Sequence, residues 1–326
     1  MSNKILILYP QTNKHLGLWN DLLSDDRAML MCAGKKKLDG FLLFLFRIYF
    51  KFHRRLRRLP LHRCWFEYSE LYKKVKLVDH LVVVDGALNT VELYELRKCR
   101  QINPNLKISL YFINSMDANS PIMIKVRPKV GEFNWENIYT FDKCDADKYG
   151  YVYAGFMYYS KHKLTCQQSP RYDVHFVGGV KGGREDLINA TFSFFEENGI
   201  NCDFNLMIVG GQPCKRKIDG ISYFSDGWLP YEQVLNKVND SKCILEICQQ
   251  GQSGATLRYF EAVCYNKKLL TNNPNVKNFP FYNPQFIKVF DSPSAIDINW
   301  LKEDFAVNYG YQDEFSPRHL VDFILG

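Results

Sequence analysis

Residues 243–273 read CILEICQQGQSGATLRYFEAVCYNKKLLTNN, and this stretch contains a complete strand, loop, helix and strand unit. Cys243–Cys248 is a short apolar run of the kind that forms a buried parallel strand. Residues 249–254 are polar, include two glycines and predict a loop. Residues 255–265 then show helical spacing, and Leu269–Thr271 begins the next strand. This order predicts an α/β fold with parallel sheets.

The loop and the start of this helix carry residues suited to a nucleoside diphosphate. A helix N-terminus offers free N–H groups and the positive end of its dipole. We expect Gly254 to allow a close backbone approach, Thr256 to add a hydroxyl and Arg258 to bind phosphate oxygens bidentately. Glu261, one turn further on, is placed to accept hydrogen bonds from ribose hydroxyls. A plain β–α–β crossover that binds nothing is the alternative.

The segment SGATLRYFEAVCYNKKLLTNN, residues 253–273, resembles the donor-binding segment of GT-B glycosyltransferases. It is most similar to bacterial surface-polysaccharide members, the group with lipopolysaccharide core transferases and CgeB-like proteins. Glu261 matches the second glutamate of that family's Glu-x7-Glu pattern, and the first falls at Ser253. Asn266 and Leu269 stand where the family usually has Gly and Pro.

The resemblance spans most of residues 172–290 and implies two Rossmann-like domains facing across a cleft. It implies an N-terminal acceptor-binding domain over 1–160, a nucleotide-sugar-binding domain over 171–300, and a C-terminal helix over 301–326 that packs back towards the first domain. The implied reaction moves a sugar from a nucleotide sugar, expected to be a UDP-sugar, to a hydroxyl of a lipid-linked bacterial cell-envelope glycan such as lipopolysaccharide, capsule or O-antigen. A UDP-sugar 2-epimerase-like enzyme and a non-catalytic membrane-associated scaffold are the alternatives.

A second glycine-rich loop, GGVKGG at 178–183, follows a strand-like run and precedes an amphipathic helical pattern. It matches neither the dinucleotide fingerprint nor the P-loop. By the resemblance, Gly179, Lys181 and Arg184 are expected to face the donor. Tyr223 is a candidate to stack on the nucleotide base, although an aromatic residue in a strand is more often part of the core.

Two residues in the N-terminal half are candidates for catalysis. Asp85 ends the buried strand-like run HLVVVD, where open α/β sheets place ligands, and is the candidate base that deprotonates the acceptor hydroxyl. A turn or capping aspartate is the alternative. His15 lies in the loop after the first strand, Ile5–Tyr9, with a plain surface residue as the alternative. No metal is expected, because protein cations balance the diphosphate charge and because no Asp-x-Asp motif is recognised, Asp142 and Asp145 having the wrong spacing.

The stretch Phe41–Phe66 mixes aromatic and aliphatic residues with seven basic ones: Arg47, Lys51, Arg54, Arg55, Arg57, Arg58 and Arg63. Its longest apolar run is too short to span a bilayer. The pattern favours an in-plane contact with anionic lipid. A core helix with a solvated basic face and a nucleic-acid patch are the alternatives, but no recognised nucleic-acid motif accompanies it, and no nucleic-acid partner is expected.

Composition bounds these interpretations. The 326 residues suffice for two domains, and a hydrophobic share of 46% allows full cores. The net charge of +7 suits anionic nucleotides or an anionic membrane surface. The ten cysteines show no Cys-x-x-Cys spacing and predict reduced, cytosolic thiols. Because Met1–Lys4 leads directly into a strand, we expect no signal peptide and a cytoplasmic protein at the inner-membrane face.

Overall fold

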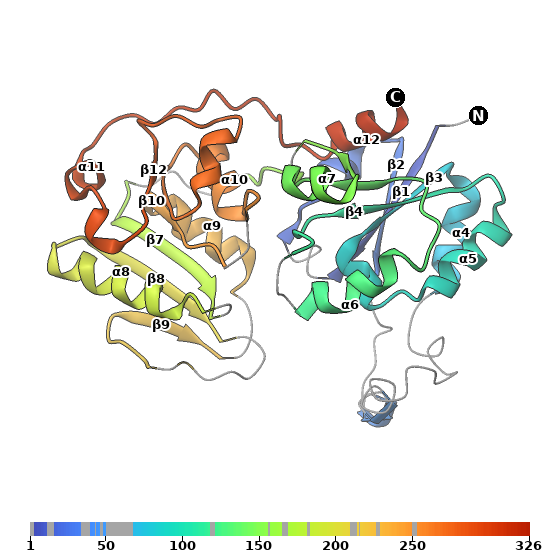
Figure 1. The fold of residues 1–326 in the computed structure, drawn as a ribbon, viewed down its shortest axis with the longest axis horizontal. Helices are drawn as coiled ribbons and strands as arrows, with labels where there is room; N and C mark the ends of the chain where they lie inside the picture. The colour runs from blue at the N-terminus through green and yellow to red at the C-terminus, as the bar shows by residue number, and fades with distance from the viewer. Residues whose placement is uncertain are drawn as a thin grey trace. The chain divides into compact units, whose positions relative to one another are not determined.

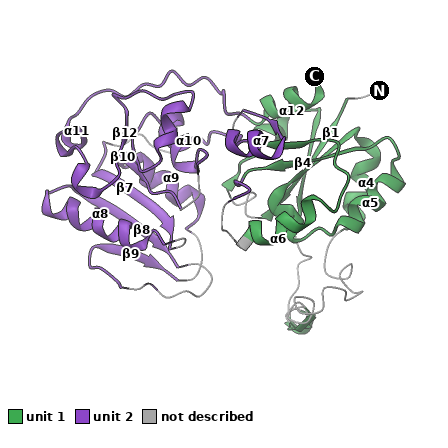
Figure 2. Ribbon diagram, in the orientation of Figure 1, with its two compact units in different colours: residues 1–113, 121–140, 317–326 green, residues 114–120, 141–316 purple. Residues whose placement is uncertain are grey.

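A computed structural model of the chain describes residues 3–11, 16–33, 40–42, 44–45, 48–49, 68–117, 121–155, 157–164, 169–180, 183–208, 214, 216–225, 229–249 and 253–326. The chain forms two compact units (Figure 2). Unit 1 consists of residues 1–113, 121–140 and 317–326, and unit 2 of residues 114–120 and 141–316. Unit 1 is therefore assembled from three separate parts of the chain.

The first sheet is built on strands that are apolar along most of their length. Its order is β2-β1-β3-β4-β5-β6, with β1 (Ile5–Pro10), β2 (Ala28–Ala33), β3 (His80–Val84), β4 (Lys107–Phe112), β5 (Ile138–Thr140) and β6 (Val152–Tyr153). The pairs among the first five strands are parallel. Strands that are buried on both faces read as continuous hydrophobic runs, which explains LVVV in β3.

Helices and short turns join the strands of unit 1. These are η1 (Asn20–Ser24), α4 (Tyr68–Lys74), η2 (Val75–Leu77), η3 (Asp85–Asn89), α5 (Leu93–Ile102) and α6 (Pro121–Val130). The chain runs from β1 outward to β2, then returns to β3 on the other side of β1. Such a switch point is where open α/β sheets bind ligands, beyond the carboxyl ends of the strands. Turn η3, which begins at Asp85, follows β3 directly at this point.

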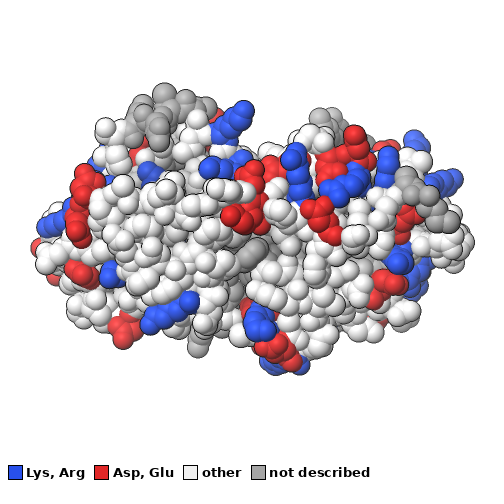
Figure 3. All heavy atoms as spheres, turned by 90° about the horizontal axis from the view of Figure 1, so that it is seen from above, with Lys and Arg blue, Asp and Glu red and all other residues white. Residues whose placement is uncertain are grey.

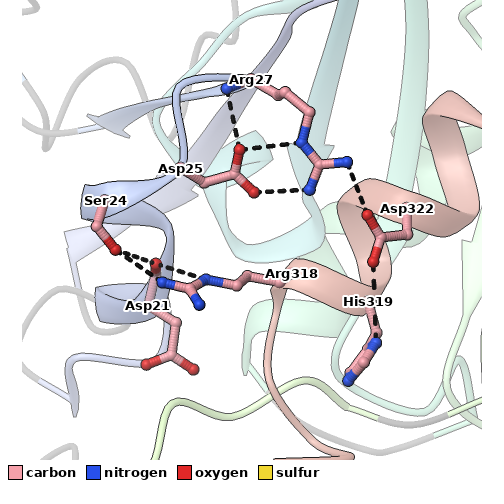
Figure 4. Close-up of polar contacts among 7 residues, drawn as sticks. All are labelled: Asp21, Ser24, Asp25, Arg27, Arg318, His319 and Asp322. Carbon is pink, nitrogen blue, oxygen red and sulfur yellow. Dashed lines mark hydrogen bonds and ion pairs between the residues drawn. The ribbon is translucent and has the colours of Figure 1, made fainter.

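The last helix, α12 (Arg318–Leu325), belongs to unit 1 although the whole of unit 2 precedes it in sequence (Figure 1). Its polar contacts with the start of the chain are drawn in Figure 4. The Arg27 guanidinium donates to Asp322 at 2.7 Å, and the Arg318 guanidinium donates to the Ser24 hydroxyl at 2.7 Å. The apolar side of α12 is buried, so both polar and apolar contacts fix it to unit 1.

Unit 2 holds a second six-stranded sheet of order β12-β11-β10-β7-β8-β9. The strands are β7 (Tyr172–Gly179), β8 (Cys202–Met207), β9 (Ile221–Phe224), β10 (Ser241–Glu246), β11 (Lys268–Thr271) and β12 (Ile287–Val289). All five pairs are parallel. The helical elements are α7 (Lys143–Tyr149), α8 (Glu185–Glu197), α9 (Tyr231–Asn239), α10 (Leu257–Cys264), η4 (Pro274–Asn278), η5 (Pro293–Ala295) and α11 (Ile298–Lys302). The switch point lies between β7 and β10.

The two faces of the unit 2 sheet differ in polarity. One face packs against α8 and α11 through an apolar cluster that includes Phe176, Phe195 and Phe204. Successive side chains of a strand point to opposite faces. His175 therefore points to the other face, as does its register partner Asp203, and both are buried. The face towards α9 and α10 is thus polar yet shielded from solvent.

The predicted α/β class with two parallel-sheet units is confirmed. Over the face drawn in Figure 3, basic and acidic side chains lie side by side. None of the helices in the described ranges is long and apolar enough to cross a membrane.

Candidate functional site

The predicted strand, loop, helix and strand unit is present at the switch point of unit 2. Strand β10 ends at Glu246, α10 begins at Leu257, and β11 pairs with β10 in parallel, with Cys243 opposite Lys268. Residues 250–252 of the connecting loop lie outside the described ranges. The N-terminus of α10 therefore lies just beyond the carboxyl end of a central strand, the usual position of ligands in such sheets.

Thr256 caps the N-terminus of α10. Its hydroxyl oxygen accepts a hydrogen bond from the Arg258 N–H at 3.1 Å, and its proton is donated to the Glu246 carboxylate. The Thr271 hydroxyl donates to the other Glu246 oxygen. Burial raises the pKa of Glu246, and the two hydroxyl donors oppose that rise. Thr256 thus joins the helix to β10 through Glu246.

Arg258 and Glu261 form an ion pair one turn apart on α10. The Arg258 Nη2 donates to Glu261 Oε1 at 2.6 Å, with side-chain exposures of 13% and 0%. The Tyr231 hydroxyl donates to the same oxygen at 2.9 Å. Burial raises the pKa of the Glu261 carboxyl to about 7, against the lowering effect of Arg258 and Tyr231.

One polar atom of each residue in this pair makes no hydrogen bond with any described residue. Arg258 Nη1 and Glu261 Oε2 are buried and have no hydrogen-bond partner in the described part of the chain. A buried polar atom without a partner costs about 1–3 kcal/mol, and such atoms mark places that a ligand or water can satisfy. The pair therefore contains one cationic donor and one carboxylate acceptor whose hydrogen bonds are not made within the described ranges.

The loop before α10 is held by side chains of unit 2. Ser253 donates to Asp142 Oδ2 at 3.0 Å, and the Asn273 amide donates to the Ser253 carbonyl at 3.1 Å. Gly254 is buried, and a Cβ at this position would overlap the Phe141 ring. Close packing against Phe141 accounts for the glycine in this structure.

Arg184 holds the carboxyl ends of the two central strands. Its guanidinium donates to the Gly179 carbonyl at 3.1 and 2.8 Å and to the Ile247 carbonyl at 2.6 Å. Burial lowers the pKa of Arg184, and the positive charge of Arg258 lowers it further. Arg184 therefore adds buried positive charge at the carboxyl ends of these strands.

Other predicted site residues lie apart from this pair. The Tyr223 hydroxyl accepts from the Ile218 N–H at 2.9 Å, and its ring packs against the apolar cluster on the α8 face, opposite Arg258. In unit 1, Asp85 is fully buried, and its carboxylate accepts from the N–H groups of Gly86 at 2.5 Å and Ile113 at 3.4 Å. Its role as a base stays a prediction.

Some predictions fall outside the described residues. These are His15, Lys181 and most of Phe41–Phe66. Within that segment, the described side chains of Phe41 and Phe44 are 71% and 57% exposed, with ring centroids 6.5 Å apart.

A buried charged cluster under α9 was missed by sequence reasoning. Asp203 accepts from Lys237 at 3.0 Å and lies 3.1 Å from His175 Nδ1. Burial opposes ionisation of Asp203, but the hydrogen bonds from His175 and Lys237 prevail and lower its pKa to about 2. The available signal is polar residues alternating with apolar ones in β7 and β8.

One motif was also missed. Asp145 and Asp147 form an Asp-x-Asp triplet, a spacing that can bind a metal. In the structure Asp145 is buried and accepts from the Met116 N–H at 2.7 Å, whereas Asp147 is exposed and pairs with Lys143. In the described ranges, no group of three His, Cys, Asp or Glu residues is arranged to hold a metal ion. The eight cysteines in those ranges are free thiols.

Among solved structures, the chain is similar to an alpha-glucosyltransferase in complex with UDP-glucose and DNA containing an abasic site. The TM-score is 0.52 at 11% identity, over 99% of this chain and 93% of that one. The chain has a GT-B fold. A second complex of an alpha-glucosyltransferase, with UDP and a 13-mer DNA containing a central A:G mismatch, gives a TM-score of 0.50 at 11% identity over 99% and 90% of the two chains.

A T4 phage BGT in complex with its UDP-glucose substrate gives a TM-score of 0.47 at 15% identity, over 99% of this chain and 92% of that chain. No family model matches the chain, and no curated protein matches its sequence. The GT-B fold is therefore seen with only 11% sequence identity to the two structures with TM-scores of 0.50 and 0.52.

Proposed function

We propose that this protein is a glycosyltransferase that moves a sugar from a UDP-sugar to an acceptor hydroxyl. The observation that carries the proposal is the buried Arg258–Glu261 pair at the start of α10, with Arg258 Nη1 and Glu261 Oε2 unpartnered. A UDP-sugar presents both chemistries that these atoms need, diphosphate oxygens for the guanidinium and ribose hydroxyls for the carboxylate. The GT-B fold supports the same reading.

Unit 2 is proposed to bind the donor. Arg258 and Lys181 contact the diphosphate. Arg184 adds positive charge from the carboxyl ends of the two central strands. Glu261 accepts from the ribose hydroxyls, and the loop at Ser253 carries the backbone past the phosphates. Because arginines balance the diphosphate charge, no metal is needed for donor binding.

Unit 1 is proposed to supply the acceptor side, with Asp85 as the base that deprotonates the hydroxyl. The proposed acceptor is a lipid-linked saccharide of the bacterial cell envelope, reached from the cytoplasmic face of the inner membrane. The exposed rings of Phe41 and Phe44, together with the basic residues that follow in the sequence, support a peripheral membrane contact.

DNA is a second candidate acceptor. One observation favours it: the two structures with TM-scores of 0.50 and 0.52 are alpha-glucosyltransferases in complex with DNA. A transfer assay separates the two acceptors. Radiolabelled UDP-glucose, UDP-galactose and UDP-N-acetylglucosamine are each incubated with a polyprenyl-diphosphate-linked saccharide, and with duplex DNA carrying a hydroxymethylated base. Label in the lipid fraction supports the first acceptor, and label in the DNA fraction supports the second.

Donor binding is tested first, by calorimetry against UDP, GDP, CMP, ADP and dTDP. We expect selective binding of UDP and a loss of roughly 10- to 150-fold in Arg258→Ala, as for a charge-assisted contact of about 1.5–3 kcal/mol. Arg171→Ala removes an exposed arginine that pairs with Asp240 and is the matched control. Normal UDP affinity in Arg258→Ala would refute the site. Binding of no nucleotide would favour the non-catalytic scaffold.

Asp85→Asn tests the base. A transferase that uses Asp85 loses turnover by roughly 10²- to 10⁴-fold while UDP affinity is retained. Unchanged turnover in Asp85→Asn would leave Asp85 as a turn residue. Interconversion of UDP-sugars without transfer to any acceptor would instead identify a 2-epimerase.

A further inference from the structure

Three tyrosine hydroxyls form a hydrogen-bonded chain that ends on Glu261. The Tyr231 hydroxyl lies 2.9 Å from Glu261 Oε1 and 2.9 Å from the Tyr159 hydroxyl. The Tyr159 hydroxyl lies 3.2 Å from that of Tyr265. The Tyr265 oxygen accepts from the His162 N–H at 3.0 Å, and its hydroxyl also lies within donating distance of the His162 carbonyl, at 3.1 Å. The chain therefore joins α10 and α9 to the segment around residues 159–162.

The direction of the protons follows from the chemistry of the last acceptor. An ionised carboxylate only accepts hydrogen bonds, so Tyr231 donates its single proton to Glu261. The Tyr231 oxygen is then free to accept, and Tyr159 supplies the proton. Burial raises the pKa of Tyr159 and Tyr231 well above the ordinary tyrosine value, so both hydroxyls remain protonated donors.

Water does not compete for these groups. Tyr159 and Glu261 are fully buried and Tyr231 is nearly so. Tyr159 is itself fixed, because its N–H donates to the Phe315 carbonyl at 2.7 Å and its ring stacks on Phe260 with centroids 6.3 Å apart. The chain is therefore built from rigid, dehydrated parts, in which each hydrogen bond fixes the orientation of the next group.

We infer that Tyr231, supported by Tyr159, is a positioning residue for the donor site: it holds Glu261 in the ionised form and orientation that leaves Oε2 for the ribose and clamps Arg258 against the diphosphate. This inference rests on the proposed function. Tyr231 itself touches neither ribose nor phosphate in this assignment and acts through Glu261.

The inference predicts a particular pH dependence of donor binding. In the described part of the chain, the titratable groups around Glu261 include Arg258 on its own helix, Tyr231 on α9, Glu246 on β10, and Tyr159, Tyr265 and Cys264. The His162 imidazole packs against the rings of Tyr231 and Tyr159. Protonation of Glu261 removes its ion pair with Arg258, so affinity falls as the pH drops through about 7. Loss of the Tyr231 hydrogen bond raises the pKa of Glu261 and moves this fall to higher pH.

The test measures UDP-glucose affinity by calorimetry from pH 5.5 to 9 in the full-length protein. UDP-glucose replaces UDP because a terminal phosphate monoester titrates near pH 6. In Tyr231→Phe, we expect affinity at pH 7 to fall about fivefold, the midpoint of the pH profile to move up, and affinity at pH 9 to recover. Glu261→Gln is expected to bind weakly at every pH, with no midpoint.

Two further variants keep the test decisive. Tyr309→Phe removes a hydroxyl that donates to the Lys267 carbonyl at 3.1 Å, outside the chain, and is expected to leave the pH profile unchanged. Tyr159→Phe is expected to shift the midpoint in the same direction as Tyr231→Phe but less, and replaces it if Tyr231→Phe does not fold.

The outcomes separate this inference from the proposed function. Wild-type midpoints in both Tyr231→Phe and Tyr159→Phe, with weak binding in Arg258→Ala, would overturn the tyrosine role and leave the donor site intact. An equal loss of affinity at all pH values in Tyr231→Phe would also overturn it, because that is the mark of general destabilisation. Normal binding in Arg258→Ala would overturn the donor site itself.

Discussion

The two faces of the unit 2 sheet share their strands but are built on opposite principles. Towards α8 and α11 the strands present Phe176, Phe204 and other apolar side chains in close contact. Towards α9 and α10 the same strands present His175, Asp203 and Glu246, all buried. The first face gains free energy from burial of apolar area. The second buries charges that stabilise only while each keeps its partner.

This contrast explains where a ligand site can lie. An apolar face fills its space completely, because any gap costs packing energy. A polar face needs a partner for every donor and acceptor. Arg258 Nη1 and Glu261 Oε2 have none in the described part of the chain, and we propose that the donor substrate supplies it. The apolar face thus supplies rigidity, and the polar face holds the atoms that we propose to bind the donor.

The largest expected effect is the loss of stability when a cavity is made in the apolar face. Phe195→Ala empties a fully buried site and is expected to lower the free energy of unfolding by about 3–5 kcal/mol, with the donor affinity of the folded fraction unchanged. Urea unfolding and calorimetry measure the two quantities. Phe194→Ala, at a partly buried neighbour, is the control and should cost less. Equal costs would mean that the face is not closely packed.

A smaller effect is expected on the polar face, where the contribution of Asp203 to stability depends on pH. The pKa of Asp203 is lowered from 3.8 to about 2 in the folded state, so its carboxylate stabilises the protein above pH 4 and loses this effect as the pH falls through 2. Asp203→Asn is expected to cost about 2 kcal/mol at pH 7. The difference from wild type should shrink below pH 4, as followed by urea unfolding at several pH values.

The control for that experiment is an exposed aspartate of the same unit. Asp219→Asn is expected to change the free energy of unfolding by less than about 0.5 kcal/mol at any pH. A pH-independent cost in Asp203→Asn would show that Asp203 contributes through packing and not through its charge.

A still smaller effect concerns the loop at the edge of the polar face. Ser253→Ala removes the hydrogen bond to Asp142 and should cost about 1 kcal/mol of stability. Thermal unfolding measures the stability. A titration with UDP-glucose measures the donor affinity, which reports on the position of the loop. Ser294→Ala, at an exposed serine hydroxyl, is the control. Equal shifts in the two variants would mean that the Asp142 contact does not hold the loop.

Removal of divalent metal ions is expected to have no effect on donor binding or transfer. If arginines alone balance the diphosphate, donor affinity and transfer should be the same in EDTA and in magnesium. A loss of transfer in EDTA, restored by magnesium, would contradict metal independence and would make the Asp145–Asp147 triplet the first place to look.

Local patterns predicted the central strands well. The apolar runs of β3 and β10 are bounded by polar or glycine residues, and each forms a strand near its predicted limits. Strand β2 (AMLMCA) carries no β-branched residue, which weakens its strand signal, and no prediction covered it. Helix α6 was also missed, because Pro128 lies inside it and proline usually marks a helix end.

Only the part of the candidate site that lies on or next to helix α10 was predicted from the sequence. Thr256, Arg258 and Glu261 lie within two turns, so their proximity follows from helical spacing. The partners that complete the site come from distant parts of the chain: Tyr231 lies 30 residues before Glu261, and Tyr159 a further 72. Strand register and helix packing bring these together, and a single sequence does not specify either.

The assignment of α12 to unit 1 has a consequence for biosynthesis. Residues 317–326 leave the ribosome only after all of unit 2 has been made. The strands of unit 1 therefore lack the Arg27–Asp322 ion pair and the buried side of α12 until the whole chain has been made. A released chain that ends before residue 317 would carry all residues of unit 2 but an incomplete unit 1, with the apolar surface that packs against Leu320 and Val321 open to chaperones or proteases.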